Sequence, residues 1–358
     1  MSFAGSYRPG DVTILLKPLP LQDFTDIPEK ERLIQSGQRH YSEMLSPESL
    51  PSPRYLDVFR TACAVNGARM AQDCLHLASL IAARRPGEIT IVSLARAGTP
   101  VGVVVNRLLN DVLQRPCTHY SVSIIRDRGI DRVALKYVLE RHSAESIVFV
   151  DGWTGKGVIA RELSSTINDY NLEHGTAIDD GLYVLSDLAG VAACAASCDD
   201  YLIPSSILNA TVSGLVSRSI LNDAIGPDDF HGCVYYSQFL PHDQSQTFAD
   251  DLVKQASSML LADAGPIDKD AAGLVSRQFI AETLSKYGIL DVNLVKPGIG
   301  EATRVLLRRT PRLLVVRDRA APEVAHLILL AEEKGVPVQV DAALPYFAVS
   351  LIRSAIDA

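Results

Sequence analysis

Ile147-Val148-Phe149-Val150-Asp151-Gly152-Trp153-Thr154-Gly155-Lys156-Gly157 is the stretch of this chain that decides its fold. An apolar run rich in β-branched residues ends at the carboxylate of Asp151. A loop of small residues follows, and from Val158 onward apolar residues recur at helical spacing. Glycines let a backbone approach a ligand closely, and loop amides with a helix N-terminus favour anions. This order of strand, acid, loop and helix predicts a site for a sugar phosphate.

Spacing excludes two common phosphate-binding loops. A Walker A loop requires a glycine where this chain has Val150, and a Ser or Thr where it has Gly157. A dinucleotide fingerprint requires G-x-G-x-x-G after a strand, whereas residues 152–157 read G-x-x-G-x-G. An ordinary turn between a strand and a helix is the alternative interpretation.

A second turn of similar type lies earlier in the chain. Residues 91–100 read Ile-Val-Ser-Leu-Ala-Arg-Ala-Gly-Thr-Pro, which predicts a strand, a small-residue turn with one arginine, and a helix capped at Thr99. In this turn Arg96, Ala97 and Gly98 are the candidate anion-binding residues. The alternative is a connecting loop with a solvated arginine.

Residues 121–131 lie between these turns and read Ser-Val-Ser-Ile-Ile-Arg-Asp-Arg-Gly-Ile-Asp. Alternation through Ile125 predicts a strand, and the charged run after it predicts a mobile loop. Arg126 and Arg128 would supply cations to a bound anion. A surface salt-bridge turn, with Asp131 capping the next helix, explains the same residues equally well.

Together the turns resemble those of type I phosphoribosyltransferases, whose fold is α/β with a parallel sheet. The resemblance implies that phosphoribosyl pyrophosphate or a ribonucleotide binds here, and that ribose 5-phosphate is transferred to or from a nitrogen base. Gly152 stands where that family has a second acid. The resemblance assigns catalytic roles to Asp151, Arg96, Arg126 and Arg128. It assigns ligand binding to Gly152, Trp153, Thr154, Gly155, Lys156, Gly157, Ala97 and Gly98.

The cofactor implied by the resemblance is Mg²⁺. It would be held through the pyrophosphate rather than by direct protein ligands, with Asp151 as the one candidate side-chain ligand. The eight histidines and six cysteines form no recognisable metal-binding pattern.

The resemblance narrows to a phosphoribosyltransferase-like family found in bacterial tellurite-resistance and stress gene clusters. It rests on residues 126–131, 151–157 and 201–217 and covers nearly the whole chain. Members are often fused to a C-terminal Pelota-type RNA-binding domain. Part of the family is also labelled StiP-like cysteine protease.

The C-terminal segment resembles a Pelota or kink-turn-binding domain, a small α/β sandwich. Residues 294–304 precede a strand at 313–316, a helix at 322–334 and a strand near 336–340. By this resemblance the RNA-binding residues are Gly298, Gly300, Glu301, Thr303 and Arg304. Gly300 replaces the family's asparagine. A capped helix start is the alternative interpretation.

Two other functions remain open alongside the transferase. The first is a non-catalytic sensor of phosphoribosyl pyrophosphate that regulates RNA. The second is a cysteine peptidase with Cys233 or Cys198 as nucleophile and His231 or His242 as base, although neither cysteine lies in a recognisable nucleophile motif.

Bulk properties predict a cytoplasmic protein without a membrane segment. The chain has 358 residues, 47% hydrophobic content and a formal net charge of −8, so tight non-specific binding to nucleic acid is not expected. We expect the following parts: a hood or cap at 1–54, the phosphoribosyltransferase-like domain at 55–263, a linker and bridging helix at 264–288, and the Pelota-like domain at 289–358. Oligomeric state cannot be deduced from the sequence.

Overall fold

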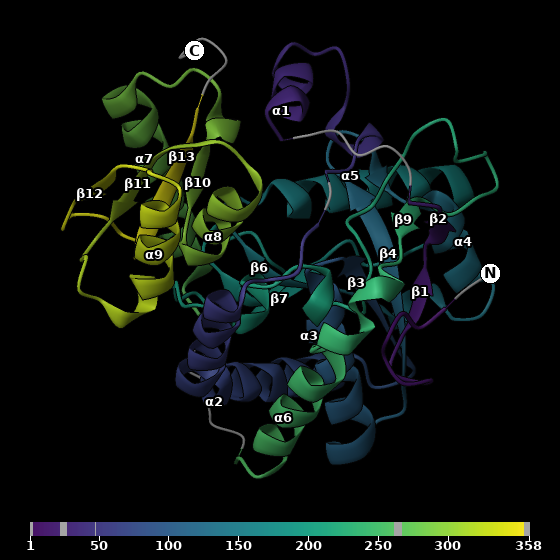
Figure 1. Ribbon diagram of the computed structural model, residues 1–358. Helices are drawn as coiled ribbons and strands as arrows, with labels where there is room; N and C mark the ends of the chain where they lie inside the picture. Colours follow the sequence, from purple (N-terminus) through teal and green to yellow (C-terminus); the bar gives the residue numbers. More distant parts are fainter. Residues whose placement is uncertain (1–2, 22–26, 47, 261–266, 354–358) are drawn as a thin grey trace.

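A mostly parallel sheet forms the centre of the molecule (Figure 1). The computed structural model describes the chain except for residues 1–2, 22–26, 47, 261–266 and 354–358. In spatial order the parallel strands are β1 (Thr13–Leu15), β4 (Cys117–Ile125), β3 (Ile89–Ala95), β6 (Ile147–Thr154), β7 (Leu182–Asp187) and β8 (Cys194–Ser197). The short strand β5 (Gly129–Ile130) pairs antiparallel with β4. The predicted mixed α/β architecture with a parallel sheet is therefore confirmed.

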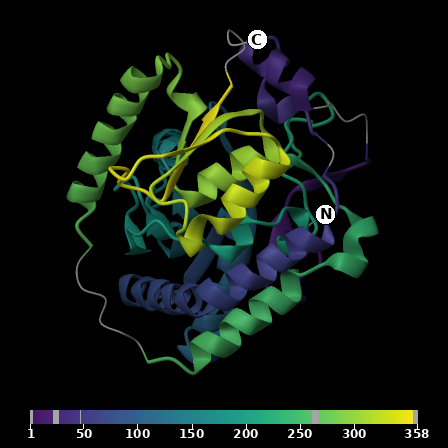
Figure 2. The ribbon, with the colours of Figure 1, turned by 60° about the vertical axis from the view of Figure 1, so that its left-hand side comes forward.

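Both faces of this sheet are covered, which explains why its strands are apolar throughout. Alternate strand residues enter different clusters: Ile91 and Val148 pack on one side, and Val92 and Phe149 on the other. The first side is covered by α2 (Pro53–Arg84), α3 (Gly98–Arg107) and α6 (Ser245–Ser257). The second side is covered by α4 (Arg132–Leu139) and α5 (Val158–His174). Figure 2 shows α6 lying alongside α2.

A second, four-stranded sheet lies toward the C-terminus. Its order is β10 (Val295–Pro297), β13 (Ala348–Ile352), β11 (Pro311–Val316) and β12 (Val338–Val340). β13 runs antiparallel to both of its neighbours, whereas β11 and β12 are parallel. Three helices accompany this sheet: α7 (Lys269–Tyr287), α8 (Ile299–Arg308) and α9 (Ala325–Glu333). We call residues 289–353 the C-terminal lobe.

Smaller elements complete the fold. A two-stranded parallel sheet joins β2 (Lys17–Leu19) to β9 (Gly232–Val234). Early in the sequence, residues Ile27–Gln35 form α1. A π-helical turn, Leu108–Val112, continues α3. Short 3₁₀ helices span Tyr41–Glu43, Ala144–Ser146, Pro204–Ser206, Ala210–Val212, Ser237–His242, Val292–Leu294 and Pro322–Val324.

The C-terminal lobe and the main sheet share one hydrophobic core. Ile299 and Leu306 of α8 belong to the same buried cluster as Val150 of β6. Polar contacts reinforce this packing, since the carboxylate of Asp200 accepts hydrogen bonds from the backbone N–H groups of Ile299 and Phe347, both at 2.9 Å. The two parts are thus packed together rather than loosely tethered.

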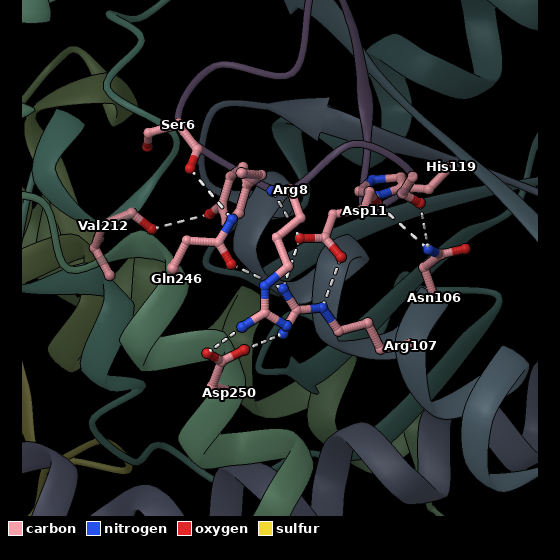
Figure 3. A network of polar contacts seen from close by, with 11 residues as sticks. Ser6, Arg8, Asp11, Asn106, Arg107, His119, Val212, Gln246 and Asp250 are labelled. Carbon is pink, nitrogen blue, oxygen red and sulfur yellow. Dashed lines mark hydrogen bonds and ion pairs between the residues drawn. The ribbon is translucent and has the colours of Figure 1, made fainter.

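A buried ion-pair network fixes the N-terminal segment to the helices (Figure 3). The Arg107 guanidinium donates to both carboxylate oxygens of Asp11, at 2.7 and 2.6 Å, and to Asp250 at 2.6 Å. Arg8 pairs with the same Asp250 at 2.6 Å. Since Arg107 lies at the end of α3 and Asp250 in α6, one arginine holds three segments together.

Two local predictions differ from the structure. The strand that ends at Asp151 in the sequence interpretation continues to Thr154, because Trp153 and Thr154 pair with β7. The apolar run at residues 201–203 is of the kind that predicts a further strand, and this prediction is wrong: the stretch is buried coil that packs in the core shared with α2. Apolar character signalled burial there, but Pro204 follows directly and begins a 3₁₀ helix instead of a strand ladder.

Candidate functional site

A deep cleft lies where the carboxyl ends of the central strands meet the C-terminal lobe. It consists of two adjoining cavities of about 340 Å³ and 500 Å³. Both cavities share a wall formed by Tyr41, Asp151, Trp153, Ile159, Lys296, Glu301, Arg304 and Arg309. We call the two cavities together the junction cleft. Its position at the carboxyl edge of a parallel sheet is typical of ligand sites in α/β proteins.

The spatial order of the strands in the main sheet explains how the two predicted turns come to line one cleft. β3 and β6 are adjacent and parallel, so Arg96 and Asp151, which lie at their carboxyl ends, are brought to the same edge. Both residues line the smaller cavity. The backbones are close, since a Cβ on Gly98 would lie 2.5 Å from the Val150 carbonyl oxygen. The peptide bond between Ala95 and Arg96 is cis.

Asp151 is the acid at the centre of the cleft. Its Oδ1 accepts a hydrogen bond from the Gly152 N–H at 2.8 Å. Burial raises the pKa of Asp151 to about 6, against the opposing effects of Arg304 and this hydrogen bond. The carboxyl group therefore changes its charge near neutral pH, as groups at functional sites often do.

The C-terminal lobe contributes an ion-pair cluster to the same cleft. Glu301 lies 3.1 Å from Arg304 and 3.7 Å from Lys296. Although burial opposes ionisation of Glu301, Lys296, Arg304 and Lys156 together hold its pKa below the usual value. The Arg304 guanidinium stacks over the Trp153 ring at 4.4 Å, so the only tryptophan of the chain packs the junction.

Close backbone approach explains two glycines at this junction. A Cβ on Gly300 would lie 2.7 Å from the Trp153 ring, and one on Gly155 would lie 2.9 Å from Glu301. A side chain at either position would push the C-terminal lobe away from β6. These glycines therefore serve contact between the two parts of the chain.

Two further cationic side chains, those of Lys156 and Arg126, line the larger cavity. Lys156 donates a hydrogen bond to the Val292 carbonyl, and burial together with nearby Lys296 lowers its pKa to about 7. Arg126 lies 3.0 Å from Asp127 and donates to Asn293 at 3.2 Å. Both side chains thus bridge from the main sheet to the C-terminal lobe.

Several residues predicted for the site have other roles in the structure. The Thr154 hydroxyl donates to Asp187 at 2.5 Å and accepts from the Ala189 N–H at 3.1 Å, so its hydrogen bonds are internal. Arg128 pairs with Glu43 at 2.8 Å and does not line the cleft. Thr303 is fully buried and bonds to Ile299 and His326.

Of the remaining predicted residues, some line the cleft and others do not. Ala97, Gly155 and Gly157 line the cleft, and Gly152 lies beside it. Gly298 has a left-handed φ of +85° and packs against Leu188. Of the predicted RNA-binding residues, Glu301 and Arg304 alone face the cleft within the part of the chain that is described.

Sequence reasoning missed several residues of the cleft, including Tyr41, Ser206, Arg218, Ser219 and Lys296. They come from segments far apart in the chain, among them two 3₁₀ helices and the strand β10, and the sequence motifs did not assign them to the site. Tyr41 is positioned between two cations, since Arg126 and Arg218 lie 5.5 and 5.6 Å from its ring centre.

The candidate peptidase residues lie outside this cleft. Cys233 has no exposed surface, and burial raises the pKa of its thiol to about 12. Cys198 is partly exposed, with a pKa raised to about 11 by burial and then by Asp187 and Asp199. His231 shares a hydrogen bond with Ser123 at 2.8 Å. Among the described residues no cysteine sulfur bonds to a histidine ring.

The predicted Mg²⁺ stays a prediction. Over the described ranges, no group of three or more His, Cys, Asp or Glu side chains could hold a metal ion. The charged residues that line the cleft with Asp151 are mostly cationic, which does not favour a divalent cation there.

Comparison with known proteins places the chain in a stress-resistance family. Residues 5–253 match the model of the tellurite-like stress resistance cysteine protease StiP, and residues 274–354 match that of the Pelota RNA binding domain. The chain belongs to the StiP family. It is 41% identical to the cysteine protease StiP of Acinetobacter baylyi, over 98% of this chain and 94% of that protein.

These findings correct the functional prediction. The resemblance to a tellurite-resistance family with a Pelota-type domain is confirmed, whereas the assignment to phosphoribosyltransferases is not supported. Transfer of ribose 5-phosphate is contradicted as the main function, because the matching family and relative are named as cysteine proteases. A phosphoribosyl pyrophosphate or ribonucleotide partner is likewise unsupported. The turns near Arg96 and Asp151 are arranged as expected, but turns of this kind do not specify one chemistry.

The predicted domain boundaries stay predictions, with β1 of the N-terminal segment lying in the main sheet. Each helix that the structure describes is too short or too polar to cross a bilayer.

Proposed function

We propose that this chain is a cysteine peptidase of the StiP family that also binds RNA, with RNA phosphates held in the junction cleft. The geometry favours the RNA-binding part, and the relative favours the peptidase part.

One observation carries the RNA proposal: cations from both parts of the chain converge in one cleft. The described lining includes Arg96, Arg126, Lys156, Arg218, Lys296, Arg304 and Arg309, against the acids Asp151, Asp291 and Glu301. The chain as a whole has a net charge of −8, so this cationic region is local. A local cationic cleft favours a polyanion because phosphate contacts dominate affinity for nucleic acids.

The match of residues 274–354 to a Pelota RNA binding domain supports the same proposal. Within the matched region, Glu301 and Arg304 of α8 line the cleft. Gly298 and Thr303 pack inward instead. RNA contact in this proposal therefore runs through the cations of the cleft rather than through a glycine turn.

RNA affinity of charge-neutralising variants tests the proposal. We expect Arg126→Gln and Lys296→Gln to weaken binding of a single-stranded RNA by about tenfold each, because each removes a phosphate contact. The slope of log affinity against log salt should fall by about one per lost contact. Fluorescence anisotropy over a range of salt concentrations measures both quantities.

Arg60→Gln provides the control, since Arg60 lies on the exposed face of α2 and pairs only with Asp57 in the described contacts. It should bind RNA like the wild type. Equal affinity of the wild type and both cleft variants would contradict the proposal.

The peptidase part is supported by the name of the relative, with which this chain shares 41% identity. Accessibility then selects between the two candidate nucleophiles. Cys233 lies at 0% exposure in β9, whereas Cys198 is partly exposed just after β8, at the carboxyl edge of the sheet. Cys198 is therefore open to a reagent from solvent, whereas Cys233 is not.

Alkylation and peptide hydrolysis test this assignment. We expect iodoacetamide to modify Cys198 before Cys233, and Cys198→Ala to abolish hydrolysis of a fluorogenic peptide. Cys63→Ala is the matched control because Cys63 is also partly exposed. Full hydrolysis by Cys198→Ala, or loss with Cys63→Ala alone, would rule out Cys198 as the nucleophile.

A further inference from the structure

Four buried polar atoms lack a partner on the wall of the smaller cavity of the junction cleft. They are Nη2 of Arg96, Nη1 of Arg218, Oγ of Ser206 and Oγ of Ser219, and none has a hydrogen-bond partner within the described residues. All four residues line this cavity of about 340 Å³. Arg96, Ser206 and Ser219 are 8%, 4% and 6% exposed, so their side chains are more than nine-tenths buried.

Such a concentration is unusual, because buried polar groups in folded proteins nearly always have partners. A buried donor without a partner destabilises the folded state, because it has lost its hydrogen bonds to water. Another nitrogen of each guanidinium group has hydrogen-bond partners. Arg96 donates to Glu48 at 2.6 Å and to the Val216 carbonyl at 3.1 Å. Arg218 donates to the Met44 carbonyl. The guanidinium groups are therefore held in place while one nitrogen of each is left over.

The fixed positions also bring two like charges together. Burial, with a contribution from nearby Arg96, lowers the pKa of Arg218 to about 10 against the opposing effects of Tyr41 and Glu48. Glu48 pairs with Arg96, whereas Arg218 forms no ion pair in the part of the chain that the structure describes. An anion between the two guanidinium groups would relieve this repulsion and satisfy both free nitrogens.

The number of free groups indicates the kind of anion. A carboxylate has two oxygens, and the two free guanidinium nitrogens are enough to contact both of them. A phosphoryl group presents three or more oxygens, and arginine forks match its geometry. The two serine hydroxyls supply the additional donors that a phosphoryl group would use.

We infer that Arg96, Arg218, Ser206 and Ser219 form a binding site for a phosphoryl group. The group is either inorganic phosphate or the terminal phosphate of an RNA strand that lies in the cleft. The second source rests on the proposed RNA function, and the first does not.

Calorimetric titration of the full-length protein with inorganic phosphate tests the site directly, with chloride of equal ionic strength in the reference. We expect saturable binding to the wild type, and a melting temperature that rises with phosphate concentration because the ligand binds the folded state. Absence of both effects would overturn the inference.

Substitutions then locate the bound group. Ser219→Ala and Ser206→Ala should each weaken phosphate binding about fivefold, and Arg218→Gln about tenfold or more. Ser219→Ala should leave the melting temperature of the ligand-free protein unchanged or higher, since the hydroxyl it removes is unpartnered. A purely structural hydroxyl would give the opposite shift. Ser257→Ala on α6, where the serine is exposed, is the matched control.

A pair of RNA oligonucleotides of one sequence, with 5′-phosphate or 5′-hydroxyl, separates the two sources. Tighter binding of the phosphorylated strand, lost in Ser219→Ala, supports the terminal phosphate. Equal binding of both strands with retained binding of inorganic phosphate supports the free ion. Failure of all RNA to bind would remove the proposed RNA function without affecting the inorganic phosphate result. Binding of a peptide with a free C-terminal carboxylate, in place of phosphate, would overturn the inference.

Discussion

At the scale of single residues, the junction cleft adjusts the charges of the groups that enclose it. The pKa of Asp151 is raised to about 6 and that of Lys156 is lowered to about 7, in both cases chiefly by burial. The two groups therefore titrate close to neutral pH, although one is an acid and the other a base. Sequence spacing predicted that Asp151 ends a strand and that Lys156 lies in the loop after it. The pKa values are shifted by burial and by charges of the C-terminal lobe, which no local pattern places there.

The lowered pKa of Lys156 leads to a prediction for stability. Unfolded lysine keeps its proton to a pH near 10.4, so between about pH 7 and pH 10 folding releases a proton and this lysine makes stability rise with pH. We expect Lys156→Met to stabilise the protein most at and below pH 7, and its advantage to shrink toward pH 10. Urea unfolding of both proteins from pH 6 to pH 10 measures the difference, and a constant difference would contradict the prediction.

At the scale of elements, the sequence predicted most of the parallel sheet and its helices. It did not predict the contacts between segments that are far apart in the chain. Apolar spacing from Val158 onward identified α5 correctly because this helix buries one face, and the expected bridging helix corresponds to α7. The continuation of β6 to Thr154 and the coil at residues 201–203 depend on pairing with distant segments. Local hydrophobicity cannot distinguish a paired strand from a buried loop. The network around Arg107 in Figure 3 likewise joins segments that no sequence motif connects.

The Arg107 network carries the prediction at this scale. Arg107→Met should lower the free energy of unfolding by about 3–5 kcal/mol, because it leaves Asp11, which is 7% exposed, without its cation. Arg60→Met removes an exposed pair and should change stability by less than about 1 kcal/mol. Urea denaturation gives both values, and a similar small loss in the two variants would show that the network adds little.

At the scale of the whole molecule, the two regions matched by separate family models share one core. Leu306 and Leu327 of the C-terminal lobe lie in the same apolar cluster as Met70 of α2 and Ile91 of β3. The candidate site depends on this packing, because its walls come from both regions. The sequence identified several residues of the site. Their convergence depends on long-range contacts, which cannot be deduced from a single sequence.

The shared core predicts one cooperative unfolding transition. Scanning calorimetry of the full chain should show a single peak, with equal calorimetric and van't Hoff enthalpies. Trp153 fluorescence, which reports on the junction, should change at the same temperature as far-ultraviolet circular dichroism. Two separated transitions, or early loss of the tryptophan signal, would mean that the C-terminal lobe detaches before the main sheet melts.

The position of β13 has a consequence for the order of folding. β10 and β11 are close in the chain but do not pair with each other, because β13, which comes later, lies between them. The second sheet therefore cannot grow by adding neighbouring hairpins and must close a long loop before its middle strand is in place. Loop closure of this kind slows folding. The lobe that completes the cleft therefore becomes native only after its last strand has been inserted between the two earlier ones.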